Sequence, residues 1–108
     1  MTDIEIMKKF DEKVKANGFE YKRADVLFYL KLFRYIEKEG KFNEEMGMHY
    51  VQLSIEGFAN VLDCSLGLAG KQIKQLEKFG VIKRVKGEII RDRYGLFEAY
   101  LTYISLDI

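Results

Sequence analysis

The stretch from Ser65 to Val85, SLGLAGKQIKQLEKFGVIKRV, constrains the fold of this chain more than any other. Ser65 is a residue type that caps helix N-termini, and Gly80 is the type that ends helices. Between them, apolar residues repeat at the spacing of an amphipathic helix: Ala69, Ile73 and Leu76. The β-branched run that follows favours a strand. The sequence therefore predicts a helix over residues 66–79 that leads directly into a β-strand.

Upstream of this stretch, capping residues and hydrophobic periodicity predict further helices. Thr2 and Glu5 have the spacing of a capping box, Ser54 is a second N-cap type, and Asn17-Gly18 and Gly40 are stop signals. The expected elements are a helix over about residues 3–16, a central core helix within 21–40, a loop over 41–48, a short strand at 49–53 and a short helix over 55–62. The first helix is expected to pack through Ile4, Met7, Phe10 and Val14.

The C-terminal segment predicts a β-hairpin. Two turn candidates, Lys86-Gly87 and Asp92–Gly95, precede a run over residues 96–106 that is rich in β-formers. A hairpin closed at Asp92–Gly95 uses the last strand better, and Lys86-Gly87 would then be a β-bulge, but the sequence leaves the tip open. The chain has no proline, no repeat and no low-complexity linker, so residues 1–108 are expected to form one α+β domain.

The predicted order of elements resembles that of winged helix-turn-helix proteins. The resemblance is closest in residues 53–85, because such proteins carry a capped short helix, a three-residue turn and a helix that ends L-E-x-x-G-[LVI]-I. Here that signature is Leu76, Glu77, Gly80, Val81 and Ile82. The resemblance implies a winged helix with an extra N-terminal helix, in which residues 66–79 form the DNA-recognition helix.

The chain also resembles a group of small winged-helix proteins, encoded on bacterial cassette-type mobile elements, that bind single-stranded DNA. That resemblance implies an accessory role in the replication of a mobile element, phage or plasmid, with replication proteins as partners.

Positive charge is concentrated in one part of the chain. The formal net charge is only +1, but residues 71–93 hold eight basic and three acidic residues, against ten and fourteen elsewhere. This asymmetry favours an anion-facing surface, although a solvated hairpin would give the same pattern. The predicted phosphate contacts are Lys71, Lys74, Gln75 and Lys78 on the outward helix face, extended by Lys83, Arg84, Lys86, Arg91 and Arg93 along the hairpin.

Two glycines, Gly67 and Gly70, occupy the start of the predicted recognition helix, where sequence-specific proteins carry base-reading side chains. The amides nearby are Gln72 and Gln75. Glycine within a helix costs about 1 kcal/mol relative to alanine, so a structural or functional reason is expected. The two candidates are close approach of a phosphate to the helix N-terminus and close helix–helix packing. In either case this helix is expected to bind a backbone better than it reads a sequence.

Aromatic residues near basic ones favour the binding of single-stranded DNA. Tyr94, beside Arg93 at the predicted hairpin tip, is the expected stacking residue, because base–aromatic stacking contributes about 1–3 kcal/mol per unpaired base. Strand alternation also exposes Tyr100 and places Phe97 and Tyr103 on the core side. We therefore predict DNA binding of low sequence specificity that leans towards single strands.

Two other functions remain open at this point. A dimeric transcriptional regulator of duplex DNA would need a dimer interface, for which the N-terminal helix, through Ile4, Met7 and Phe10, or the last strand is available. It would also need recognition helices about 34 Å apart. A winged-helix protein–protein adaptor would instead use Leu66, Leu68 and the hairpin aromatics as an apolar contact patch.

Composition argues against several further classes. A hydrophobic content of 48% with 32% charged residues is globular, no apolar run is as long as a membrane span, and the N-terminus has no signal-peptide pattern, so a cytoplasmic protein is expected. A single histidine, His49, and a single cysteine, Cys64, do not form a metal site or catalytic dyad on their own. GLAGKQ lacks the spacing of a phosphate-binding loop. We expect no enzymatic activity, metal or cofactor.

Overall fold

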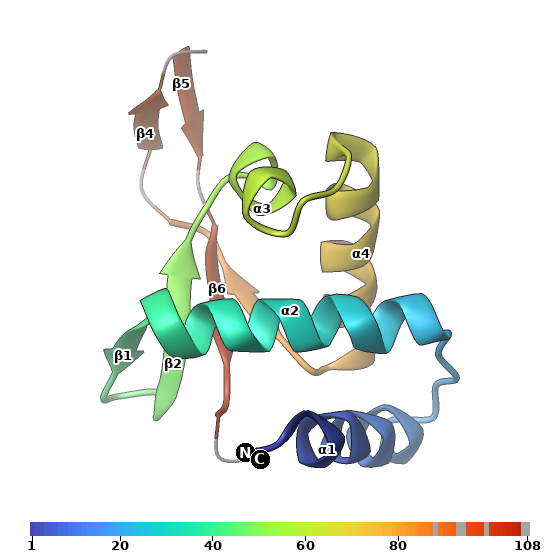
Figure 1. The fold of residues 1–108 in the computed structure, drawn as a ribbon. Helices are drawn as coiled ribbons and strands as arrows, with labels where there is room; N and C mark the ends of the chain where they lie inside the picture. Colours follow the sequence, from blue (N-terminus) through green and yellow to red (C-terminus); the bar gives the residue numbers. More distant parts are fainter. Residues whose placement is uncertain (88, 93–94, 99, 107–108) are drawn as a thin grey trace.

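The computed structural model of the chain describes residues 1–87, 89–92, 95–98 and 100–106, which form an α+β structure (Figure 1). Its elements are α1 (Asp3–Ala16), α2 (Arg23–Glu39), β1 (Lys41–Asn43), β2 (Met48–Gln52), α3 (Ile55–Val61), α4 (Leu66–Phe79), β3 (Lys83–Val85), β4 (Ile89–Asp92), β5 (Gly95–Glu98) and β6 (Leu101–Ile104). None of the helices in these residues combines the length and the apolar character needed to cross a membrane.

The predicted helix boundaries are confirmed by their caps. The Thr2 hydroxyl accepts a hydrogen bond from the Glu5 N–H, and the Glu5 carboxylate accepts one from the Thr2 N–H, which completes the capping box. The hydroxyls of Ser54 and Ser65 each accept a bond from the backbone N–H three residues later. Gly80 ends α4 in the left-handed conformation, with φ of 81°.

Four antiparallel strands form the main sheet, in the order β1-β2-β6-β3. The strand that precedes α3 therefore pairs with the last strand of the chain, which in turn pairs with β3. The prediction of a loop over residues 41–48 is confirmed only for residues 44–47, which form a turn, and is wrong for Lys41–Asn43, because β1 pairs with β2. The cross-strand pair Phe42 and His49 brings two rings to 4.9 Å between centroids, a contact that the short polar run does not reveal.

The C-terminal hairpin is divided into two segments. The predicted single strand over residues 96–106 is instead two strands, β5 and β6, of which β5 pairs with β4 in a separate ribbon and β6 with β3. The two ladders differ in register by one residue. The segments that join them include residues 88 and 99, which lie outside the described residues, so the bulge at Lys86-Gly87 stays a prediction. Asp92 lies opposite Gly95, so pairing extends to the predicted outer turn.

The core lies between the sheet and the helices, with α2 crossing the front of the sheet in Figure 1. The prediction of a central core helix is confirmed, because Tyr29, Leu32, Phe33 and Ile36 of α2 are fully buried. In α1 the buried residues are Ile6, Phe10 and Val14. The prediction that Ile4 packs inward is wrong, because the buried row of α1 repeats every four residues from Ile6. Phe10 is consequently not available for a dimer interface.

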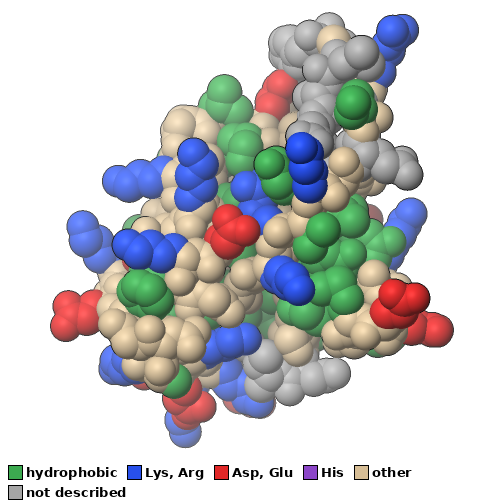
Figure 2. All heavy atoms as spheres, turned by 180° about the vertical axis from the view of Figure 1, so that it is seen from behind, with side chains coloured by type: hydrophobic (Ala, Val, Ile, Leu, Met, Phe, Trp, Pro, Cys, Tyr) green, Lys and Arg blue, Asp and Glu red, His purple; other side chains and the backbone are tan. Residues whose placement is uncertain are grey.

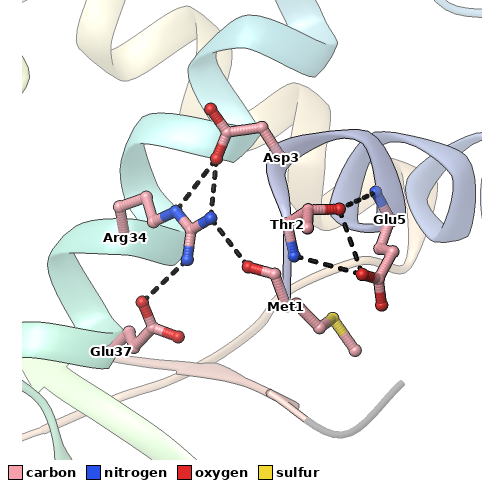
Figure 3. A network of polar contacts seen from close by, with 6 residues as sticks. All are labelled: Met1, Thr2, Asp3, Glu5, Arg34 and Glu37. Carbon is pink, nitrogen blue, oxygen red and sulfur yellow. Dashed lines mark hydrogen bonds and ion pairs between the residues drawn. The ribbon is translucent and has the colours of Figure 1, made fainter.

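Arg34 joins the beginning of α1 to α2 (Figure 3). Its guanidinium donates to the Asp3 carboxylate at 2.6 and 3.1 Å, to Glu37 at 2.9 Å and to the Met1 carbonyl at 2.8 Å. Exposed ion pairs of this kind contribute little net stability. The network therefore orients the start of α1 on α2, while the buried aromatic residues hold the two helices together.

Replacing Tyr29 by phenylalanine is expected to stabilise the fold by about 1 kcal/mol, because it removes a desolvated hydroxyl. That hydroxyl has no hydrogen-bond partner among the described residues, and burial raises the pKa of Tyr29. The ring, 4.9 Å from that of Phe10, would keep its packing. Urea unfolding measures the change. The matched control is Tyr21→Phe, which removes a hydroxyl that donates to Asp11 at 2.6 Å and should not stabilise. Destabilisation by Tyr29→Phe would contradict the expectation.

Candidate nucleic-acid interface

The two helices α3 and α4 pack against each other across a short turn. The residues predicted to face each other, Ala69, Ile73 and Leu76 of α4 and Phe58, Ala59 and Leu62 near α3, are all buried in one hydrophobic core. In the turn between them, Asp63 has a positive φ of 52°, and Ser65 caps α4. The buried face of α4 determines which of its residues point outward.

The outward face of α4 is basic, as predicted. Lys71, Lys74 and Lys78 are exposed, and Gln75 is half-buried. Within the described part of the chain, none of these three lysines lies within ion-pair distance of a carboxylate. The Nζ of Lys78 lies 5.7 Å from the ring centroid of Phe19, so this lysine is held towards the α1–α2 connection. The lysines thus offer uncompensated positive charge along one helix face.

Gln72 does not belong to this outward face. Its side chain is 8% exposed, and its Oε1 atom is buried without a partner among the described residues. Gln72 therefore is not placed to read a base, and Gln75 is the remaining amide of α4 that could do so. Helical spacing could have revealed this, because Gln72 lies three residues after Ala69 and four before Leu76, both in the core.

Helix–helix packing does not explain the two glycines of α4. A Cβ atom at Gly67 would meet no atom within 4 Å, and one at Gly70 would lie 3.6 Å from the Cγ2 of Ile55, an ordinary contact. Leu66 and Leu68 are exposed, and the Ser65 hydroxyl is used in the cap. The first turn of α4 is therefore an open surface of backbone and two leucine side chains, with no group suited to reading bases.

The basic residues of β3 point to opposite sides of the sheet. Arg84 lies opposite the fully buried Thr102, and its guanidinium carbon is 4.6 Å from the ring centroid of Tyr100. Lys83 lies opposite Tyr103 on the other face and is exposed. Because successive strand residues alternate in direction, the predicted phosphate track does not run along one face here.

The remaining predicted contacts lie along the hairpin. Lys86 and Arg91 are exposed, whereas Arg93 and Tyr94 lie outside the described residues, as does the side chain of Phe97. Tyr100 is 37% exposed and Tyr103 is 4% exposed, but burial does not alternate along this strand, because Thr102 is fully buried as well. The prediction that Tyr103 lies on the core side is wrong, because Tyr103 projects to the face opposite to that of Val51 and Thr102. The structure thus brings together the α4 residues, whereas Lys83 and Arg84 of β3 project to opposite faces of the sheet.

Among the described residues, no group of three or more His, Cys, Asp or Glu side chains is arranged to hold a metal ion. Cys64 is half-buried beside the core. Comparisons of the chain with protein-family models, with curated proteins and with solved structures found no match.

Proposed function

We propose that this chain is a winged-helix protein that binds DNA with little sequence specificity and prefers single strands. The order of the strands supports the fold assignment. In a winged helix the strand before the helix-turn-helix pairs with the second strand of the hairpin, and β2, β6 and β3 have this relation. In that arrangement α4 is the recognition helix, and β4 and β5 extend the wing.

The observation that carries the proposal is the contrast between the two parts of α4. Its outward face presents Lys71, Lys74 and Lys78 without carboxylate partners among the described residues, whereas its first turn offers no base-reading side chain. Lysine contacts to phosphate carry no sequence information, and base contacts supply specificity. A helix of this kind binds the DNA backbone and discriminates poorly between sequences.

The preference for single strands is supported by the pair Arg84 and Tyr100. An exposed aromatic ring beside a guanidinium is a combination that holds unstacked bases, which a duplex does not offer. Single strands occur during replication, so we propose that the chain acts as an accessory protein in the replication of a mobile element, phage or plasmid. Replication proteins are then its expected partners.

One observation favours a second candidate, a protein–protein adaptor. The exposed large hydrophobic residues Val61, Leu66 and Leu68 lie at and just before the start of α4. An apolar patch at this position would bind a protein partner with little dependence on salt. If the chain binds a protein partner independently of salt and does not bind DNA, the adaptor function is favoured over DNA binding.

The proposed function is tested by fluorescence anisotropy with one labelled oligonucleotide, offered as a single strand and as a duplex. We expect tighter binding to the single strand and a fall in affinity with salt, to which three lysine–phosphate contacts of α4 contribute a log–log slope of roughly −2. A second oligonucleotide of scrambled sequence is the control and should bind equally well. The absence of binding to all these probes, or strong discrimination between the two sequences, would contradict the proposal.

A further inference from the structure

The register of the main sheet places two lysines and two tyrosines in one row. Lys41 of β1 lies opposite Tyr50 of β2, Tyr50 lies opposite Tyr103 of β6, and Tyr103 lies opposite Lys83 of β3. Residues directly opposite each other on paired strands project to the same face of a sheet. The row therefore crosses all four strands, with an aromatic centre and a positive charge at each end.

This row is on the face of the sheet that does not hold the core. The next residues along the strands, Val51 and Thr102, are buried and point the other way, towards the side that α2 crosses in Figure 1. Figure 2 views the molecule from behind and shows hydrophobic side chains gathered over the sheet, with Lys and Arg side chains beside them. No helix covers this face in Figure 1.

A hollow of about 830 Å³ lies at the row. Its lining includes Tyr50 and Tyr103, the amides Asn43 and Gln52, and Lys41. Tyr35 and Glu39 also line it, so the hollow extends from the row to the end of α2, whereas Lys83 is not part of the lining. Its volume is within the range of small-molecule sites, which is about 300–1,000 Å³. Aromatic rings, amides and lysine are the groups that bind a base and its phosphate.

The two tyrosine rings of the row contact each other, and one of them accepts a hydrogen bond. The ring centroids of Tyr50 and Tyr103 are 5.2 Å apart, and the Asn43 side-chain amide donates to the Tyr103 hydroxyl at 3.4 Å. Tyr103 is almost completely buried, so its ring offers little surface to a ligand. Tyr50 is only half-buried and is the ring with an accessible face.

We propose that this row is a binding site for a segment of single-stranded DNA, in which an unpaired base stacks on Tyr50 and phosphates on either side bind Lys41 and Lys83. Neither lysine has an ion-pair partner among the described residues. Three strand spacings separate them, about 14 Å, so they would contact phosphates of different nucleotides. The inference rests on the proposed function and adds to Tyr100 a second ring on which an unpaired base would stack.

The test compares Tyr50→Ala with Tyr50→Phe, using a labelled oligothymidylate as the single strand and a labelled hairpin as the duplex. We expect Tyr50→Ala to lose about tenfold in affinity for the oligothymidylate and nothing for the hairpin, because only an unpaired base can stack. Tyr50→Phe keeps the ring and should bind as the wild type does. Wild-type affinity of a folded Tyr50→Ala for the oligothymidylate would overturn the inference.

Photo-crosslinking of the wild-type chain makes the result independent of how the variants fold. A single strand that carries 5-iododeoxyuridine is irradiated with the protein, and the adduct is mapped by mass spectrometry. An adduct at Tyr50 supports the site. Adducts confined to α4 would overturn this inference and leave the proposed function standing, whereas no binding of the wild type to either probe would overturn both.

Discussion

Replacement of Lys71, Lys74 and Lys78 together by glutamine is expected to lower the affinity for DNA by between about tenfold and a hundredfold at moderate salt. The loss should be similar for every sequence, and the log–log salt slope should flatten by about two units for a single strand. The reason is that these lysines are exposed and have no carboxylate partner in the described part of the chain, so their charge is available to phosphate. Anisotropy titrations at several salt concentrations measure both quantities.

The matched control removes the same charge from a different part of the surface. Lys8, Lys31 and Lys38 are exposed on α1 and α2, and their replacement by glutamine should change the affinity little. Salt screens charges that are more than about 10 Å from the bound strand. An equal loss in the control would show that net charge matters and the position on α4 does not. The single variant Lys74→Ala should flatten the slope by somewhat less than one unit.

Features encoded by neighbouring residues were predictable from the sequence. The capping box at Thr2, the caps at Ser54 and Ser65 and the stop at Gly80 place the helix ends, because each acts within one turn of its own helix. The basic outer face of α4 follows in the same way from the spacing of its buried residues. These predictions are confirmed, and they could be made from the sequence because they need no knowledge of distant contacts.

Features that depend on strand pairing were not predictable in this way. β1 is three residues long and polar, so it carries no periodic pattern, and it forms only because β2 is beside it. Tyr50 carries no sequence signal of a site residue for a related reason. Its position beside Tyr103 and Lys41 depends on the register of β2 with two other strands, one of them at the far end of the sequence. The division of the last strand into β5 and β6 also depends on different pairing partners.

Replacement of Gly80 by alanine is expected to destabilise the fold by about 2–3 kcal/mol. Gly80 has a φ of 81°, where a side chain is strained, and a Cβ atom there would lie 2.7 Å from the Nδ2 of Asn17. That Nδ2 donates to the Phe79 carbonyl at 2.8 Å, so moving it breaks the bond between the end of α1 and the end of α4. Urea unfolding monitored by circular dichroism measures the loss. Gly80→Asn should lose less than Gly80→Ala, because asparagine tolerates this φ better.

The glycines at the other end of α4 should respond with the opposite sign. The Cβ atom added by Gly70→Ala would make an ordinary contact, and the one added by Gly67→Ala would meet open space. Because alanine favours the helix over glycine, each variant should stabilise the fold by up to about 1 kcal/mol. If a phosphate approaches the bare first turn, Gly67→Ala should also weaken DNA binding, because the new methyl group occupies the exposed backbone surface. A Gly67→Ala variant that gains stability and binds DNA as the wild type does would exclude that approach. The lysine face and the tyrosine row would then be the remaining contacts, and the glycines would have no part in binding.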